Sequence, residues 1–94
     1  MSGTSRSSAD LDPRRKKLLF QSWHRGTREM DLLMGRFADA TVDEWSEGDM
    51  TDMEALLRVP DPELYKWLTE HEPVPDNHRS AILDRVIAFH KAPK

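Results

Sequence analysis

The residues with the most distinctive chemistry lie in one short segment, Arg25-Gly26-Thr27-Arg28-Glu29. Arg25 offers a planar fork of hydrogen-bond donors, and Gly26 lets another backbone approach closely. Glu29 places a carboxylate at the positive end of the next predicted helix. The segment therefore suits a contact surface. Two purely structural explanations stay open: Arg25 and Glu29 could pair with each other across the joint, and Gly26 could serve only to end a helix.

No other set of residues points to catalysis or to a metal. The sequence contains no cysteine, which excludes disulfides and thiolate ligands. Ser22 and Thr27 have no recognisable base–orienter pair, and there is no glycine-rich phosphate loop. The histidines lack the i, i+4 spacing of a helical metal site, and we interpret them as structural or surface residues: His24, His71, His78 and His90. We expect a chain that is not an enzyme and has no metal site.

Length and composition indicate one small domain with a large solvated surface. The chain has 94 residues, of which 37% are apolar and 33% charged. A chain of this size buries about two-thirds of its unfolded surface, which leaves little room for an enclosed active site. The net charge of -3 gives no general attraction to nucleic acid.

The charges are unevenly placed along the chain. Residues 14–17 form a basic run, whereas residues 39–54 contain seven acidic side chains and no basic one. A surface with two signs of charge favours an oriented protein partner. Taken singly, each run is better interpreted as an ordinary solvated face.

We interpret residues 1–11 as a disordered tail and residues 12–92 as a single helical domain. No stretch is long and apolar enough to span a membrane, and residues 1–10 lack the apolar centre of a secretory signal. We therefore expect a bacterial, cytoplasmic protein without membrane insertion.

The elements that must position the Arg25 to Glu29 segment are helices, because apolar residues recur at helical spacing throughout. Asp12 with Pro13, and Asp61 with Pro62, are helix-start signals. The predicted helices run from Asp12-Pro13 to about His24, from Thr27 to about Ala40, from about Glu47 to Arg58, from Asp61 to near His71, and from an Asp76 or Asn77 cap until Pro93 ends order. This pattern predicts an all-α fold, a small five-helix bundle.

Large side chains on these helices are predicted to form the core. A tryptophan can also anchor an interface, but burial is the better interpretation, above all for Trp67. Gly35, inside the second helix, is explained by close helix packing. The predicted core includes Trp23, Trp45, Trp67, Met30, Met34, Met50 and Met53.

Two blocks of sequence together resemble one protein family. The first block is Leu18-Leu19-Phe20-Gln21-Ser22, then Arg25-Gly26-Thr27-Arg28-Glu29, then Phe37-Ala38. The second is Asp61-Pro62-Glu63-Leu64-Tyr65-Lys66-Trp67-Leu68-Thr69-Glu70, an acidic helix start followed by aromatic-x-Trp. Over about residues 14–90 the chain resembles the SdhE family of succinate dehydrogenase assembly factors, called assembly factor 2 in mitochondria.

The resemblance implies a five-helix chaperone that is not an enzyme. It implies binding to the flavoprotein subunit of succinate dehydrogenase or fumarate reductase, and promotion of covalent FAD attachment (flavinylation) to a histidine of that subunit. The FAD would belong to the client and not to this chain. The family's partner-binding RGxxE surface carries over as Arg25, Gly26 and Glu29, with Asp31 as a weaker candidate. The competing interpretation is a non-catalytic helical adaptor for a different protein.

Overall fold

The computed structural model describes residues 11–91, and these form an all-α fold of five α-helices without strands. The predicted fold class and helix number are therefore confirmed. The predicted tail, apart from Leu11, and the predicted end of order at Pro93 lie outside the described residues. The helices are α1 Pro13–Trp23, α2 Arg28–Thr41, α3 Glu47–Leu56, α4 Asp61–Leu68 and α5 Ala81–Lys91, with short 3-10 helices at Val42–Glu44 and Asp76–His78.

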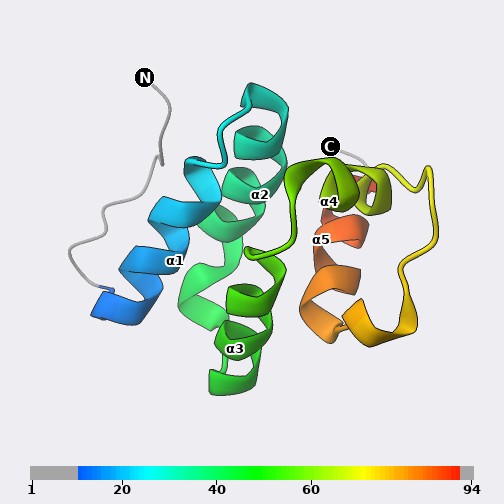
Figure 1. The fold of residues 1–94 in the computed structure, drawn as a ribbon. Coiled ribbons are helices and arrows are strands. Elements are labelled where there is room, and N and C mark those ends of the chain that lie inside the picture. Colours follow the sequence, from blue (N-terminus) through cyan, green and yellow to red (C-terminus); the bar gives the residue numbers. More distant parts are fainter. Residues whose placement is uncertain (1–10, 92–94) are drawn as a thin grey trace.

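Helix α2 lies at the centre of the arrangement. It contacts α1, α4 and α5, while α3 packs against α1 and α5. Figure 1 shows α1 beside α2 on one side of the molecule, and a long loop, coloured yellow, that connects α4 to α5 at the opposite edge. The joint between α1 and α2 lies close to the chain that enters α4, and this proximity brings the two resembling sequence blocks together.

The core prediction is confirmed, since all three tryptophans and the four methionines are buried. Trp45 is 1% exposed and stacks on Phe37 with 6.2 Å between ring centroids. Phe89 from α5 meets Phe37 edge-on at 5.8 Å. The indole N–H of Trp45 donates to the Thr41 hydroxyl at 2.9 Å, so this large ring is buried without losing its hydrogen bond.

The first two helices begin as predicted. The Asp12 side chain accepts a hydrogen bond from the Arg15 N–H, and Pro13 occupies the first helical position. The Thr27 hydroxyl accepts from the Met30 N–H at the start of α2. Local capping therefore determines where α1 and α2 begin, and Thr27 fixes the end of the α1–α2 joint at α2.

Helix α4 begins at Asp61, as predicted, but two other predictions about it are wrong. Asp61 is the first helical residue rather than the N-cap, which is Pro60, and its carboxylate binds Arg25. The helix ends at Leu68, before the predicted end near His71. Glu70 adopts a positive φ of 59° and donates its N–H to the Trp67 carbonyl, and the next N–H, of His71, bonds back to the Lys66 carbonyl. This pattern is a Schellman helix end formed without glycine.

The predicted start of α5 is also wrong. The segment that contains Asp76 and Asn77 forms a separate 3-10 helix, and α5 begins at Ala81. The Ser80 hydroxyl accepts from the Leu83 N–H at 3.2 Å, so Ser80 supplies the capping interaction.

The basic and acidic runs pair with each other, which the sequence analysis did not anticipate. Arg14 on α1 donates to Glu54 through Nε and Nη2, both at 2.9 Å, and to Glu47 at 2.8 Å. Arg15 donates to the backbone carbonyls of Val42 and Trp45. Half of the basic run thus fastens α1 to the chain around α3. Exposed ion pairs contribute little singly, but the fork of Arg14 on Glu54 has the stronger bidentate geometry.

This pairing predicts a stability that falls in acid. Hydrogen bonds from Arg14 hold the pKa of the Glu54 carboxyl below its ordinary value. The ionised carboxylate therefore stabilises the folded chain above the ordinary glutamate pKa of about 4.3. That contribution is lost as the pH falls through the lower, folded-state pKa.

The midpoint temperature of thermal unfolding is measured at a series of pH values from about 7 to about 3. Glu54→Gln should lower the midpoint at neutral pH and flatten its decline in acid. Glu44→Gln is the matched control, because Glu44 is exposed and makes no hydrogen bond or ion pair within residues 11–91. Identical pH profiles for the two variants would contradict the assignment.

Gly35 yields a second stability prediction. A Cβ at this buried position would lie 2.3 Å from the ring of Trp23, which confirms the prediction of close helix packing. Gly35→Ala should lower the free energy of unfolding by about 1–3 kcal/mol, because the packed α1–α2 contact must move apart. Gly48→Ala in α3 is the control, since its Cβ would meet nothing nearer than 3.7 Å. Urea unfolding of both variants checks the prediction, which fails if Gly35→Ala is as stable as Gly48→Ala.

Candidate functional site

The joint between α1 and α2 is a four-residue turn, residues 24–27, that depends on a glycine. Gly26 has a φ of +109°, a backbone conformation that residues with a side chain rarely adopt. A Cβ built on Gly26 would meet no atom within 4 Å. The requirement for glycine inside this chain is therefore conformational, and the space around the residue is open to a partner.

Arg25 uses its guanidinium within the fold. Its Nε and Nη2 donate to one Asp61 carboxylate oxygen at 3.0 and 2.6 Å, and Nη2 also donates to the Val59 carbonyl at 2.8 Å. Its Nη1 donates to the Leu57 carbonyl. The side chain is only 10% exposed. Arg25 therefore fastens the α1–α2 turn to the segment that joins α3 to α4, and its ionic partner is Asp61 rather than Glu29.

Asp31 also has an internal contact. From the first turns of α2, its carboxylate accepts a hydrogen bond from the backbone N–H of Arg25 at 2.5 Å. The residue is partly buried. Asp31 thus holds the backbone of the turn while Asp61 holds the side chain of Arg25.

Glu29 differs from these two residues because it is exposed and has no hydrogen bond or ion pair to any described residue. It lies at the N-terminal end of α2, where the helix dipole favours a negative charge. A free carboxylate on a rigid helix end can accept hydrogen bonds from a partner without breaking any contact within the fold.

Glu29 lies on the rim of a shallow depression of about 470 Å³ between the starts of α2 and α4. Sequence reasoning did not identify two site residues there, Asp61 and the 40% exposed Tyr65. The resemblance of the second sequence block was a signal for both residues, but Asp61 was interpreted as a helix cap. The depression is lined by Thr27, Glu29, Met30, Asp61, Pro62 and Tyr65.

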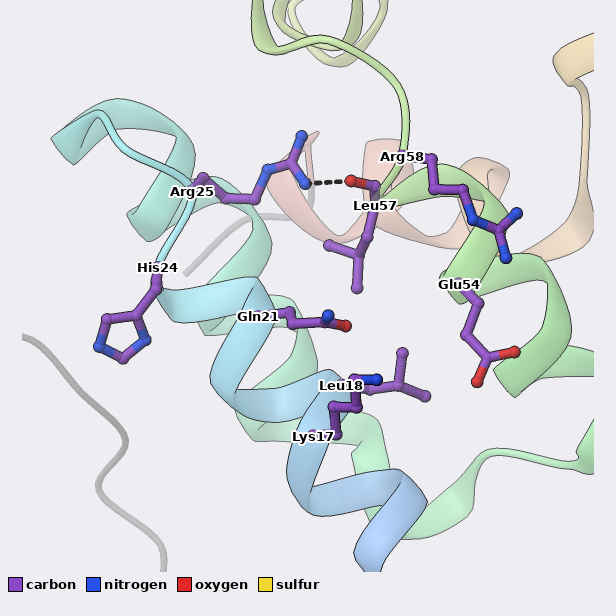
Figure 2. Close-up of a pocket in the computed structure, with 8 residues that line it drawn as sticks. All are labelled: Lys17, Leu18, Gln21, His24, Arg25, Glu54, Leu57 and Arg58. Atoms are coloured by element: carbon purple, nitrogen blue, oxygen red, sulfur yellow. Dashed lines mark hydrogen bonds between the residues drawn. The ribbon is translucent and has the colours of Figure 1, made fainter.

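A second hollow, of about 510 Å³, lies along α1 on the side that faces the end of α3. Figure 2 shows the guanidinium of Arg25 reaching across its upper end to the Leu57 carbonyl. The ring of His24 is turned away from the hollow and stacks on Phe20 with 4.0 Å between ring centroids. Arg25 and Asp61 therefore connect two surface features, since Arg25 lines this hollow and Asp61 lines the depression beside Glu29.

The described residues offer no metal-binding cluster of three or more His, Cys, Asp or Glu side chains. Among residues 11–91 there is also no helix with both the length and the apolar character needed to cross a membrane.

The Arg25–Asp61 pair yields a prediction about the site. Asp61→Asn should lower the free energy of unfolding by about 1–3 kcal/mol, because the nearly buried guanidinium loses its charged acceptor. Asp52→Asn is the control, since Asp52 makes no side-chain hydrogen bond or ion pair within the described part of the chain. Urea unfolding measures the stability, and amide exchange of residues 24–27 should rise in Asp61→Asn alone. Unchanged exchange in the turn would show that Asp61 does not hold it.

Comparison with known proteins identifies the family. A family model described as flavinator of succinate dehydrogenase matches residues 16–90. A protein named FAD assembly factor SdhE, from Acetobacter pasteurianus, is 41% identical over 78 residues, covering 83% of this chain and 72% of its own length. The mitochondrial succinate dehydrogenase assembly factor 2 of Dictyostelium discoideum is 36% identical over 78 residues, covering 83% of this chain and 55% of its own. That of Danio rerio is 31% identical over 88 residues, covering 92% and 56%.

The chain thus spans about half the length of these mitochondrial relatives and most of the bacterial one. The matched region contains α2, α3 and α4, all but the ends of α1 and α5, and both sequence blocks. The resemblance stated from those blocks is confirmed, and the chain belongs to the family of succinate dehydrogenase flavinators, which are assembly factors.

Proposed function

We propose that this chain binds the flavoprotein subunit of succinate dehydrogenase and promotes covalent attachment of FAD to a histidine of that subunit. The single observation that carries the proposal to particular residues is the state of Glu29. Its carboxylate is exposed and unpartnered within residues 11–91, beside the open space around Gly26, on a turn held by Arg25. The names of the family and of its relatives supply the client and the reaction.

In this proposal the chain acts as a chaperone and not as an enzyme. The bond between histidine and flavin forms within the client, which holds the FAD, and this chain supplies no reacting group and no flavin site of its own. The two hollows beside the turn are open surface features, which suits contact with a protein. We place the reaction in the bacterial cytoplasm, with the flavoprotein subunit of fumarate reductase as a second client.

The mechanism that we propose is selection of one client conformation. Covalent attachment requires the client's histidine to stand at near-attack distance from the reactive methyl group of the flavin, in an ordered environment for the developing charge. A binder promotes this by preferring the arrangement in which the two groups meet. A rigid turn serves such selection, because little conformational freedom is lost on binding.

The three motif residues take different parts in this docking. Gly26 lets the client's backbone approach the turn, and any side chain there would stand in the interface and strain the +109° backbone. Glu29 accepts charge-assisted hydrogen bonds that fix the register of the two proteins. Arg25 and Asp31 hold the turn in shape.

The test is covalent flavin on the flavoprotein subunit of succinate dehydrogenase, measured by in-gel fluorescence after denaturation. Deletion of the gene should abolish the signal. Glu29→Gln should reduce it strongly, because a client group left buried and unpaired costs about 2–5 kcal/mol of binding. Glu44→Gln is the matched control on another exposed, unpartnered carboxylate and should leave the signal at the wild-type level.

The outcomes test the proposed function and the proposed docking surface independently. Full covalent flavin in the deletion strain would overturn the proposed function. If the covalent-flavin signal is lost in the deletion strain but normal in Glu29→Gln, the proposed function holds and the docking surface lies elsewhere than at the turn. The melting temperature of Glu29→Gln should stay within a few degrees of wild type, because Glu29 makes no side-chain hydrogen bond or ion pair within residues 11–91 and loses only its small interaction with the helix dipole.

A further inference from the structure

The hollow along α1, which we term the α1–α3 groove, is a polar feature that the proposed docking at Glu29 does not use. Its volume is about 510 Å³. In Figure 2 the side chains of Lys17, Leu18 and Gln21 rise from α1 on one side, and those of Glu54, Leu57 and Arg58 lie on the other. The groove is lined by Lys17, Leu18, Gln21, His24, Arg25, Glu54, Leu57 and Arg58.

Most of the charges around this groove are already neutralised. Glu54 is held by the Nε and Nη2 of Arg14, both at 2.9 Å, and Arg25 is paired with Asp61. Lys17 and Arg58 are the exceptions. Both are exposed, and neither side chain makes a hydrogen bond or an ion pair within residues 11–91.

Lys17 and Arg58 act on the same region of the groove. The pKa of Glu54 is lowered first by its hydrogen bonds from Arg14, and in addition through space by Arg58 and by Lys17. Both cations therefore lie near this carboxylate. Arg14 shares its single charge between Glu54 and Glu47, so Lys17 and Arg58 give the groove a net positive charge in a chain whose net charge is -3.

We propose that the α1–α3 groove receives an acidic segment of the flavoprotein client, with Lys17 and Arg58 contacting its carboxylates from opposite walls. This inference rests on the proposed function. The positive side chains of the groove favour an acidic segment as its occupant. The client is the expected source of that segment because the groove adjoins the proposed docking surface: Arg25 lines the groove, and its partner Asp61 lines the depression beside Glu29. A client docked at the turn extends across the Arg25–Asp61 pair into the groove.

A protein segment suits this site better than a free dicarboxylate. Both cations are exposed, and an exposed ion pair contributes little by itself. A segment that belongs to a larger interface is brought to the groove by the contacts at the turn, so weak charge contacts are sufficient to orient it. The cations of the groove and the carboxylate of Glu29 then give the docking surface two signs of charge, which disfavours a reversed orientation.

The experiment compares two doubly neutralised variants. Lys17→Gln with Arg58→Gln removes the charges of the groove. Lys16→Gln with Arg36→Gln changes the net charge equally at exposed positions that do not line the groove. Association with the purified apo flavoprotein subunit of succinate dehydrogenase is measured by biolayer interferometry at low and high NaCl. The groove variant should associate roughly tenfold more slowly at low salt and respond less to added salt, and the control should match wild type.

A charge-conserving variant guards against an effect on folding. Lys17→Arg with Arg58→Lys should restore the wild-type association rate, and all variants should share the wild-type melting temperature. Equal association rates for the groove variant and its control would overturn the groove proposal and leave the proposed function standing. A wild-type chain that does not bind the subunit would overturn both.

A further measurement tests the alternative occupant. Millimolar succinate is added to the chain alone, and amide NMR shifts are followed around residues 17 and 58. Succinate-dependent shifts together with normal client binding by the groove variant would make the groove a metabolite site and overturn the proposal. Absence of shifts, with slow association of the groove variant, supports a protein occupant.

Discussion

The hydrogen bonds of one guanidinium hold together the parts of this molecule that matter for docking. Arg25 binds the Asp61 carboxylate and the carbonyls of Leu57 and Val59, so a turn from the first half of the chain is joined to a segment from the second. A planar donor fork can satisfy several acceptors at once in fixed geometry, which a lysine cannot do. The position of Gly26 and Glu29 relative to Tyr65 follows from this junction. The two ends of the Arg25 to Glu29 segment thus differ in role: Arg25 is bound within the fold, and Glu29 faces solvent.

The pairing of the charged runs has a related effect on the surface. Arg14 and Arg15 are engaged with the chain around α3, so the strong contrast of charge seen along the sequence is largely removed in the fold. Unpartnered charges remain scattered over the described surface, and three of them, Lys17, Glu29 and Arg58, line the two hollows beside the Arg25 junction. A partner at these hollows therefore meets a few fixed charges of both signs, and such a pattern favours orientation over non-specific attraction.

Capping and turn signals between neighbouring residues predicted much of the fold. The wrong predictions arose where a contact or conformation had no such signal in the nearby sequence. Asp12, Thr27 and Gly26 act through neighbours within a few positions, and the sequence analysis placed them correctly. Asp61 looked like a cap because Asp-Pro is a strong local signal, but its partner is 36 positions away. Glu70 ends α4 in a conformation usually reserved for glycine, so the sequence contained no signal for that stop. Ser80 caps α5 in place of Asp76 or Asn77, because these two residues form a separate 3-10 helix with His78.

The candidate site was predictable in position but not in the roles of its residues. Spacing alone left open whether Arg25 pairs with Glu29, and only the long-range contact with Asp61 decides this. The proximity of Tyr65 and Asp61 to Glu29 likewise depends on tertiary packing, which no local pattern encodes. The family resemblance supplied the list of residues to inspect, and the geometry separates those with internal partners from the one without.

Because the Glu29 side chain has no partner within residues 11–91, substitutions at positions 25 and 29 should have different effects in living cells. A damaging change at Arg25 disturbs the junction, so it lowers the amount of intact protein along with any activity. A change at Glu29 leaves the protein abundant but ineffective. Because the lost carboxylate also weakens docking, such a copy does not displace the normal copy from the client. The amount of protein in the cell then distinguishes the two kinds of change, since it falls for a change at position 25 and stays normal for a change at position 29.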